Sequence, residues 1–408
     1  MNVPLFGSFW ERLVAFGVLL ALFLANLGLE YHTYQNFWSK KRRYTQAQVL
    51  NQYRKRGHWV LRLRTKEGAS FYITSYEDLK DLRGRRIELL LFGQKPTFFD
   101  YLHSFYAPSY IIGVLPKNLR ESLWERVASQ HQSQLAKELF GALFLATPIQ
   151  RDFRQMLSNF GISHLVAISG FHIGLLFGFF SFVLYFVLRP VWQYLWPWTN
   201  LKRLVFTFAF AAVVGYAALL GLVPSVIRSV SMMGVGLFLF DRGLKLLSFE
   251  TLGWIVLLVL ALWPKLVWSV GFWFSVAGVF YIYLFLHHFK LSKLWSFLLL
   301  NFWVFLAMLP LSLFVFGVFN PWMLLSPLLS ILFVLFYPLA LLLHLVGYGG
   351  VLDGVVGMLG VAGEGMRVEL PLWLFGLYIL ASLLAIWRPL ALYAAYGAFG
   401  IFLIYQVA

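Results

Sequence analysis

The chain of 408 residues contains no cysteine and very little negative charge. The missing cysteines exclude disulfide bonds and thiolate chemistry, but they do not identify a cellular compartment. Charged residues make up only 12% of the sequence, and hydrophobic residues make up 60%. These proportions exclude a single water-soluble globule, and they also exclude a disordered chain, which is poor in hydrophobic residues. The composition therefore predicts a polytopic α-helical membrane protein.

The scarce charges are mostly positive. The chain has 33 Lys and Arg residues against 17 Asp and Glu residues, a formal net charge of +16. Residues 39–100 carry a net charge of +9, whereas residues 170–408 carry only +6 over a much longer stretch. Such an excess in a small polar region indicates an anionic partner, either lipid headgroups or nucleic acid.

Apolar runs divide the chain into an anchor and a membrane body. The run at residues 13–31 is long enough to span the hydrocarbon core, for which about 20 residues suffice. A cleaved signal peptide is the alternative, but no clear cleavage site follows, so residues 1–38 are interpreted as an uncleaved transmembrane anchor. Nine further runs predict membrane helices, at residues 164–188, 203–221, 225–240, 250–263, 268–288, 294–316, 322–346, 371–387 and 389–406.

Residues 39–116 have the pattern of a small β domain. Apolar and polar residues alternate within residues 59–64, 71–73 and 86–91, and glycines separate these runs. This is typical of antiparallel strands with one buried face. The size suggests a β-barrel of about five strands, of the OB type, inserted after the first transmembrane helix. Residues 117–163 are amphipathic and predict helices that lie on the membrane surface, before the membrane domain at 164–408.

Charges in the short loops indicate the orientation. With the N-terminus in the cytoplasm, nine Lys and Arg residues of these loops, Arg367 among them, lie inside, and only Lys265 and Arg388 lie outside. The positive-inside rule then places the basic β domain on the outer face of the membrane. The alternative is that this domain lies on the acidic inner leaflet.

The densest group of polar side chains is His164, Ser169, Gly170 and His172. On one continuous helix, His164 and His172 share a face and Ser169 can touch His172. A Ser–His nucleophile would need an orienting acid, and the nearest, Asp152, is twelve residues before His164. A metal site would need a third ligand, and the sequence has no HExxH or HxHxDH pattern, so no metal or cofactor is predicted. Three interpretations remain, namely a hydrogen-bonded polar patch, a substrate pathway, and metal binding or catalysis.

Two further groups lie within apolar runs. Pro224 and Ser225 resemble a helix start, and Arg228 follows one turn later. A charge at membrane depth costs several kcal/mol unless it faces a bundle interior or water. Arg228 is therefore either a clamp on backbone carbonyls or a contact for an anionic substrate. Gly271 and Ser275 form the other group, for which close helix packing is the simpler interpretation.

The β domain combines basic and aromatic side chains. OB folds hold single strands by stacking bases on aromatic rings beside Lys and Arg. Core burial is the alternative for its aromatic residues, Trp59, Phe71 and Tyr72. The predicted nucleic-acid contacts are Arg54, Lys55, Arg56, Trp59, Arg62, Arg64, Tyr72, Arg83, Arg85 and Arg86.

Residues 153–172, with the sequence Asn159-Phe160-Gly161-Ile162-Ser163-His164 and then Ile168-Ser169-Gly170-Phe171-His172, resemble the signature of the ComEC/Rec2 competence proteins. These are the inner-membrane DNA channels of natural transformation. Two mild departures are Phe171, where the family usually has Leu, and Val276, where Phe is common. The other matching segments follow in the expected order, at residues 99–102, 221–225 with Arg228, 271–275, 309–311 and 327–338.

The resemblance implies a multi-pass protein of the bacterial inner membrane whose domain at 164–408 passes single-stranded DNA into the cytoplasm. Besides DNA and the lipid bilayer, it implies an outer-face competence protein that delivers DNA. A cytoplasmic helicase or translocase would supply the driving force, since no Walker A motif is present. A homo-oligomer is also compatible with the sequence.

Many members of this family carry a C-terminal metallo-β-lactamase-like domain. The chain has no HxHxDH pattern, so a built-in nuclease is not expected, and the missing Walker A motif argues against a built-in ATPase. An alternative function is a polytopic membrane enzyme of the glycan ligase or hydrolase type that uses His164, Ser169 and His172. A small-anion transporter is a third interpretation.

Overall fold

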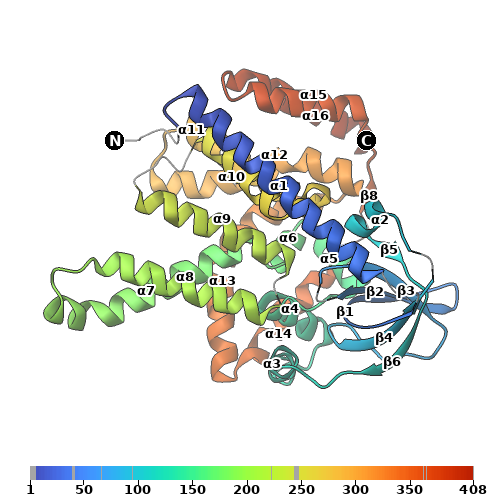
Figure 1. Ribbon diagram of the computed structural model, residues 1–408. Helices are drawn as coiled ribbons and strands as arrows, with labels where there is room; N and C mark the ends of the chain where they lie inside the picture. Colours follow the sequence, from blue (N-terminus) through green and yellow to red (C-terminus); the bar gives the residue numbers. More distant parts are fainter. Residues whose placement is uncertain are drawn as a thin grey trace.

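A computed structural model describes residues 6–38, 42–65, 67–93, 95–221, 223–242, 248–361, 363 and 365–407. It consists of a β domain at one end and a body of helices that extends away from it (Figure 1). The polytopic helical architecture predicted from the composition is confirmed.

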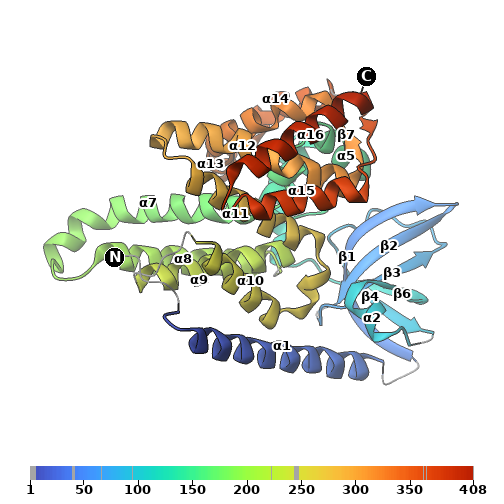
Figure 2. The same cartoon turned by 90° about the horizontal axis from the view of Figure 1, so that it is seen from above.

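Helix α1 (Phe9–Phe37) joins the two parts. Ser8 and Glu11 form a capping box at its start. Its 29 residues give a length of about 44 Å, more than the roughly 30 Å of hydrocarbon that an anchor must cross. The last turn leaves the apolar run and enters the β domain, where Tyr34 and Phe37 are buried in the core. Figure 2 shows α1 running along the body from the N-terminus to the sheet.

The β domain is an open six-stranded sheet, so the prediction of a closed barrel of about five strands is wrong. The strand order is β5-β3-β2-β1-β4-β6, and the edge strands β5 and β6 do not pair with each other among the described residues. Strand β5 has only two residues and lies parallel to β3, which leaves too short an edge for closure. The strands are β1 (Arg42–Lys55), β2 (His58–Thr65), β3 (Ser70–Ser75), β4 (Arg86–Phe92), β5 (Phe105–Tyr106) and β6 (Ser109–Val114).

The predicted alternation of buried and polar residues is confirmed. Leu61, Leu63, Phe71 and Ile73 are fully buried on one face of the sheet, which the end of α1 and the short helix α2 (Phe98–His103) cover. Arg62 and Arg64 point to the opposite face because successive side chains of a strand alternate. The sheet therefore has one apolar closed face and one arginine-bearing face.

Four short helices connect the sheet to the body: α3 (Leu119–Ala128), α4 (Gln134–Leu145), α5 (Arg151–Asn159) and α6 (Ser163–Val166). Most residues of α4 are buried, in the same hydrophobic core as α7 and α13. Helix α4 is thus part of the protein interior and not the surface helix that its amphipathic pattern suggested. The carbonyls at the C-terminal end of α4 accept hydrogen bonds from the buried Arg120 side chain. The distances are 2.7 Å to Leu145 and 2.8 Å to Ala146.

Every apolar run predicted to be helical contains a helix. The run at 164–188 is divided between two helices, because α6 ends at Val166 and the next helix begins only at Gly170. The helices of the body are α7 (Gly170–Leu195), α8 (Leu201–Leu219), α9 (Pro224–Asp241), α10 (Phe249–Leu262), α11 (Val270–His288), α12 (Lys293–Phe316), α13 (Ser326–Val346), α14 (Asp353–Gly357), α15 (Leu372–Leu384) and α16 (Pro389–Val407).

Six segments of the described chain are long and apolar enough to cross a membrane, namely α1, α7, α8, α11, α12 and Pro321–Val346, which includes α13. Helices α10, α15 and α16 are apolar but shorter by this measure. Six of the ten apolar runs thus contain a helix of membrane length within the described residues.

A two-stranded pairing changes the predicted side of two charges. Strand β7 (Val318–Phe319), which follows α12, pairs with β8 (Met366–Arg367). Arg367 therefore lies at the end of the body where α12 finishes and α15 begins. The loop analysis had placed Arg367 at the opposite end, so Arg367 and Arg388 exchange sides and the balance of loop charges is unchanged.

Candidate functional site

Helices α7, α9 and α11 all begin toward the β domain and run away from it (Figure 2). The first turns of α7 and α11 both lie against the first turns of α9. A Cβ atom added to Gly170, the first residue of α7, would lie 3.4 Å from Oγ of Ser229. A Cβ atom added to Gly271, in the first turn of α11, would lie 3.8 Å from Nη1 of Arg228. The three groups of residues singled out in the sequence are therefore neighbours in space.

Arg228 lies buried in this convergence, with 6% of its surface exposed. It makes no hydrogen bond or ion pair with any residue that the structure describes, and its Nε atom is sealed from solvent without an acceptor. Helix N-termini carry partial positive charge, so the nearby starts of α7 and α11 do not neutralise the guanidinium. The site is a buried, positively charged position to which the described residues contribute no carboxylate.

Small and hydroxyl residues occur in the same helix starts as this arginine. Helix α9 begins at Pro224, as predicted. The Ser229 hydroxyl donates to the carbonyl of Ser225 at 2.8 Å, and the Ser275 hydroxyl donates to the carbonyl of Gly271 at 3.1 Å. Each hydroxyl donates its proton to a carbonyl of its own helix. The proton is therefore not available for an anion beside Arg228.

The break between α6 and α7 corrects the prediction that His164 and His172 share a helix face. Residue Ala167 is extended and Ser169 is the N-cap of α7, because its hydroxyl accepts the N–H of Phe171. The predicted Ser169–His172 contact is present but belongs to this cap. The backbone N–H of Ser169 donates to Nδ1 of His172 at 3.3 Å, and the Ser169 hydroxyl lies 3.2 Å from the same atom.

His172 is completely buried against the rings of Phe333 and Tyr337 on α13. Because Nδ1 accepts a hydrogen bond, the ring proton sits on Nε2, which has no hydrogen-bond partner of good geometry, although the Leu165 backbone lies near. Within the part of the chain that the structure covers, no carboxylate contacts His172. A Ser–His–acid constellation is therefore not assembled here.

His164 lies on the short helix α6, and its side chain is exposed to solvent. Its Nε2 atom lies 3.5 Å from the Ser330 hydroxyl on α13. This polar contact lies between α6 and α13.

The arginine-bearing face of the sheet forms a second positive region. Arg62 and Arg64 make no ion pair with the carboxylates that the structure describes. Burial, and then the charge of Arg62, lower the pKa of both Arg64 and Arg154, which lies on α5. We name Arg62, Arg64 and Arg154 the arginine cluster. Tyr72, opposite Arg62 in the strand pairing, places its ring under that guanidinium at 5.8 Å.

Some of the other residues predicted to contact nucleic acid are exposed, and others are engaged in contacts within the protein. Arg54, Lys55 and Arg56 are exposed on the β1–β2 hairpin, whose turn at Arg56 and Gly57 has positive φ at both residues. Trp59 packs against the β-domain core, and Phe71 is fully buried, so Phe71 is not available for base stacking.

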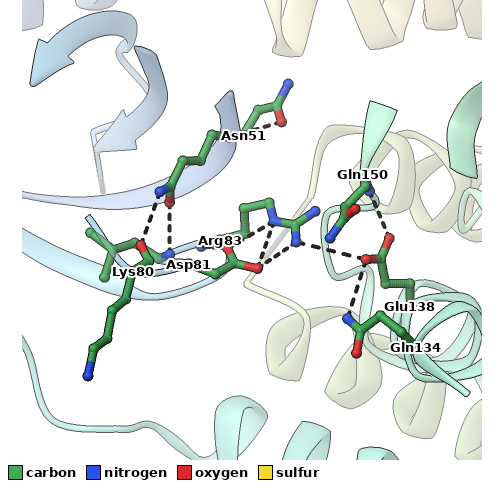
Figure 3. Close-up of polar contacts among 9 residues, drawn as sticks. Asn51, Lys80, Asp81, Arg83, Gln134, Glu138 and Gln150 are labelled. Atoms are coloured by element: carbon green, nitrogen blue, oxygen red, sulfur yellow. Dashed lines mark hydrogen bonds and ion pairs between the residues drawn. The ribbon is translucent and has the colours of Figure 1, made fainter. Parts of the chain in front are cut away.

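Arg83, Arg85 and Arg86 are occupied by contacts between the sheet and the short helices. Arg83 bonds to Asp81 at 2.9 Å and lies 3.8 Å from Glu138 of α4 (Figure 3). Arg85 pairs with Glu121 of α3 at 3.2 Å. Arg86 donates to the carbonyl of Pro116 at 3.2 Å. Their charges dock the β domain onto α3 and α4.

The sequence analysis missed Arg154 as a site residue. It lies in the recognisable stretch at 153–172, but its helical pattern had suggested a membrane-surface helix. Its proximity to Arg62, about 90 residues away in the chain, carries no signal in sequence spacing.

One comparison with known proteins finds a relationship. The model of the family described as "Competence protein" matches residues 146–408, well over half of the chain. No curated protein and no solved structure matches the chain.

The unpaired charge of Arg228 leads to a stability prediction. Arg228→Met retains a long unbranched side chain but removes the charge. We therefore expect this variant to stabilise the fold by roughly 1–3 kcal/mol. Arg120→Met, the matched control, removes a buried arginine that does have acceptors and should destabilise by a similar amount. Thermal unfolding of both purified variants measures this; a loss of stability in Arg228→Met would show that Arg228 has a structural partner.

Proposed function

We propose that this chain, which belongs to the Competence protein family, is a multi-pass membrane channel that carries single-stranded DNA inward during transformation. The family indicates a role in DNA uptake, and the membrane-length helices agree with it. The finer assignment, a single-stranded substrate that passes beside Arg228, is the proposal.

The observation that carries this proposal is the buried Arg228 side chain, for which the described residues supply no carboxylate and no hydrogen-bond acceptor. A buried guanidinium without an acceptor is costly, and such a cost persists where function requires the charge. A phosphodiester group is an anion with oxygen acceptors in the geometry that guanidinium favours. The small residues Gly170 and Gly271 bring the starts of α7 and α11 close to this charge.

The β domain would receive the strand first. The arginine cluster supplies unpaired positive charge on the sheet face that also meets α5, and Tyr72 lies beside Arg62 as a stacking surface. The exposed hairpin with Arg54, Lys55 and Arg56 extends the same field. Arg83, Arg85 and Arg86 are less suited, because their charges are already paired or bonded within the protein.

The orientation in this proposal follows the loop charges. The N-terminus lies in the cytoplasm and the β domain on the outer face, where a competence protein delivers DNA. A cytoplasmic helicase or translocase would pull the strand, and copies of the chain could share one pore.

Transformation tests the role of Arg228. We expect Arg228→Met to abolish transformation while the protein still inserts into the membrane, because the strand loses its charged contact. Arg203→Met is the control, since Arg203 is exposed and pairs with Asp241 at the far end of the body. Equal transformation by Arg228→Met, Arg203→Met and the unchanged chain would contradict the proposal.

Salt-dependent binding tests the arginine cluster. The full-length protein should bind single-stranded DNA, and replacing Arg62, Arg64 and Arg154 by Gln should weaken binding and reduce the slope of log K against log salt by about 2, since each phosphate contact contributes about 0.7. A control with Gln at Arg203, Lys290 and Lys293 has the same net charge. If the two triple variants bind alike, the cluster is not a DNA contact and only net charge matters.

A further inference from the structure

Three titratable side chains from distant segments form a chain of hydrogen bonds away from Arg228. His131 follows α3, His344 lies near the end of α13, and Asp353 begins α14. Nδ1 of His131 lies 2.6 Å from Oδ1 of Asp353, and its Nε2 lies 2.9 Å from Nε2 of His344. Nδ1 of His344 lies 2.6 Å from the carbonyl oxygen of Ala340. Only 4% of His131 and 8% of His344 is exposed.

These three contacts need one proton more than the groups normally carry. Each of the three hydrogen bonds requires a proton between its two heavy atoms. An ionised Asp353 and two neutral imidazoles supply only two protons, so one contact would bring two lone pairs face to face. A third proton, shared within the chain, completes all three bonds and leaves the cluster with no net charge.

Other charges do not account for this arrangement. Although burial alone would raise the pKa of Asp353, the hydrogen bonds from His131 and from the N–H groups of Ser133 and Gln132 lower it. On α4, which packs on His131 through the stacked ring of Phe140, Glu138 instead accepts the N–H of Gln150 at 2.9 Å, and Lys137 makes no ion pair with Asp353.

The remaining neighbours are also engaged or distant. On α3, Arg126 is exposed, and on α13, Tyr337 packs on His172. Among the described residues, therefore, the shared proton has no competing titratable partner.

The same residues connect the 130–133 loop to the helices of the body. The N–H groups of Gln132 and Ser133 donate to Oδ2 of Asp353 at 3.0 and 3.3 Å. The side chain of Gln130 donates to the carbonyl of His344 at 3.1 Å and accepts the N–H of Gly349 at 2.9 Å. A Cβ atom at Gly349 would lie 2.7 Å from Nε2 of His344, so a glycine is required for this close approach. The loop is attached here, directly before the buried helix α4.

We propose that Asp353, His131 and His344 form a proton-binding site, in which one shared proton fastens the 130–133 loop to α13 and α14, and that release of this proton as the pH rises frees the loop. The ligand of the site is the proton itself. Buried Asp and His chains of this kind serve as proton sites in membrane proteins.

Hydrogen–deuterium exchange of the full-length protein in detergent tests the site without altering it. Burial lowers the pKa of His344, although the Ala340 carbonyl and Asp353 oppose this effect, so the window of the test begins below the ordinary histidine pKa. After correction for the intrinsic pH dependence of exchange, protection of residues 130–133 should fall on the order of tenfold between about pH 5 and pH 8, the loss expected from one hydrogen bond. Protection of β2 serves as the internal control. Constant protection of the loop over this range would overturn the proposal.

A variant separates the shared proton from general effects of pH. In His344→Gln the amide N–H can donate to Nε2 of neutral His131, so the contact no longer needs an additional proton. Loop protection should then be independent of pH, whereas the control His58→Gln, on the β1–β2 hairpin, should behave as the unchanged chain. The same pH dependence in His344→Gln and the unchanged chain would also overturn the proposal; if His344→Gln does not fold, the exchange of the unchanged chain decides.

Discussion

A positive charge buried without a partner is the constraint around which the membrane body is arranged. Arg228 lies where α7, α9 and α11 begin, and glycines at 170 and 271 bring the three helices together there. Stability alone would favour an apolar residue at this position. The proposed function accounts for this arrangement, because a DNA phosphate passing Arg228 would supply the anion.

The two faces of the sheet give the β domain two separate tasks. Its apolar face closes against α1 and α2, which attaches the domain to the anchor. Its other face carries Arg62 and Arg64, and the charge of Arg62 acts on Arg154 of α5. Two further positive charges, at Arg83 and Arg85, hold the domain on α3 and α4 through Glu138 and Glu121. The excess of basic residues thus serves both docking and the positive field.

Local patterns in the sequence were sufficient for the helices, the strand faces and the helix start at Pro224, because periodicity and capping act over a few residues. They were not sufficient for sheet closure, which depends on the two-residue strand β5, or for the break at Ser169, where an N-cap interrupts an apolar run. Two contacts join segments that are distant in the sequence, so no spacing within the sequence encodes them. One is the close approach of Gly271 to Arg228, and the other is the contact of His131 with His344 and Asp353.

The most direct measurement is a crosslink between the moving strand and the site. Since the chain has no cysteine, one cysteine can be introduced at Ser225, beside Arg228, or at Leu306, an exposed position on α12. Single-stranded DNA with a thiol-reactive group on its backbone is then supplied during uptake. The account predicts an adduct at residue 225 and none at residue 306. No adduct at residue 225, or equal yields at both positions, would contradict a path beside Arg228.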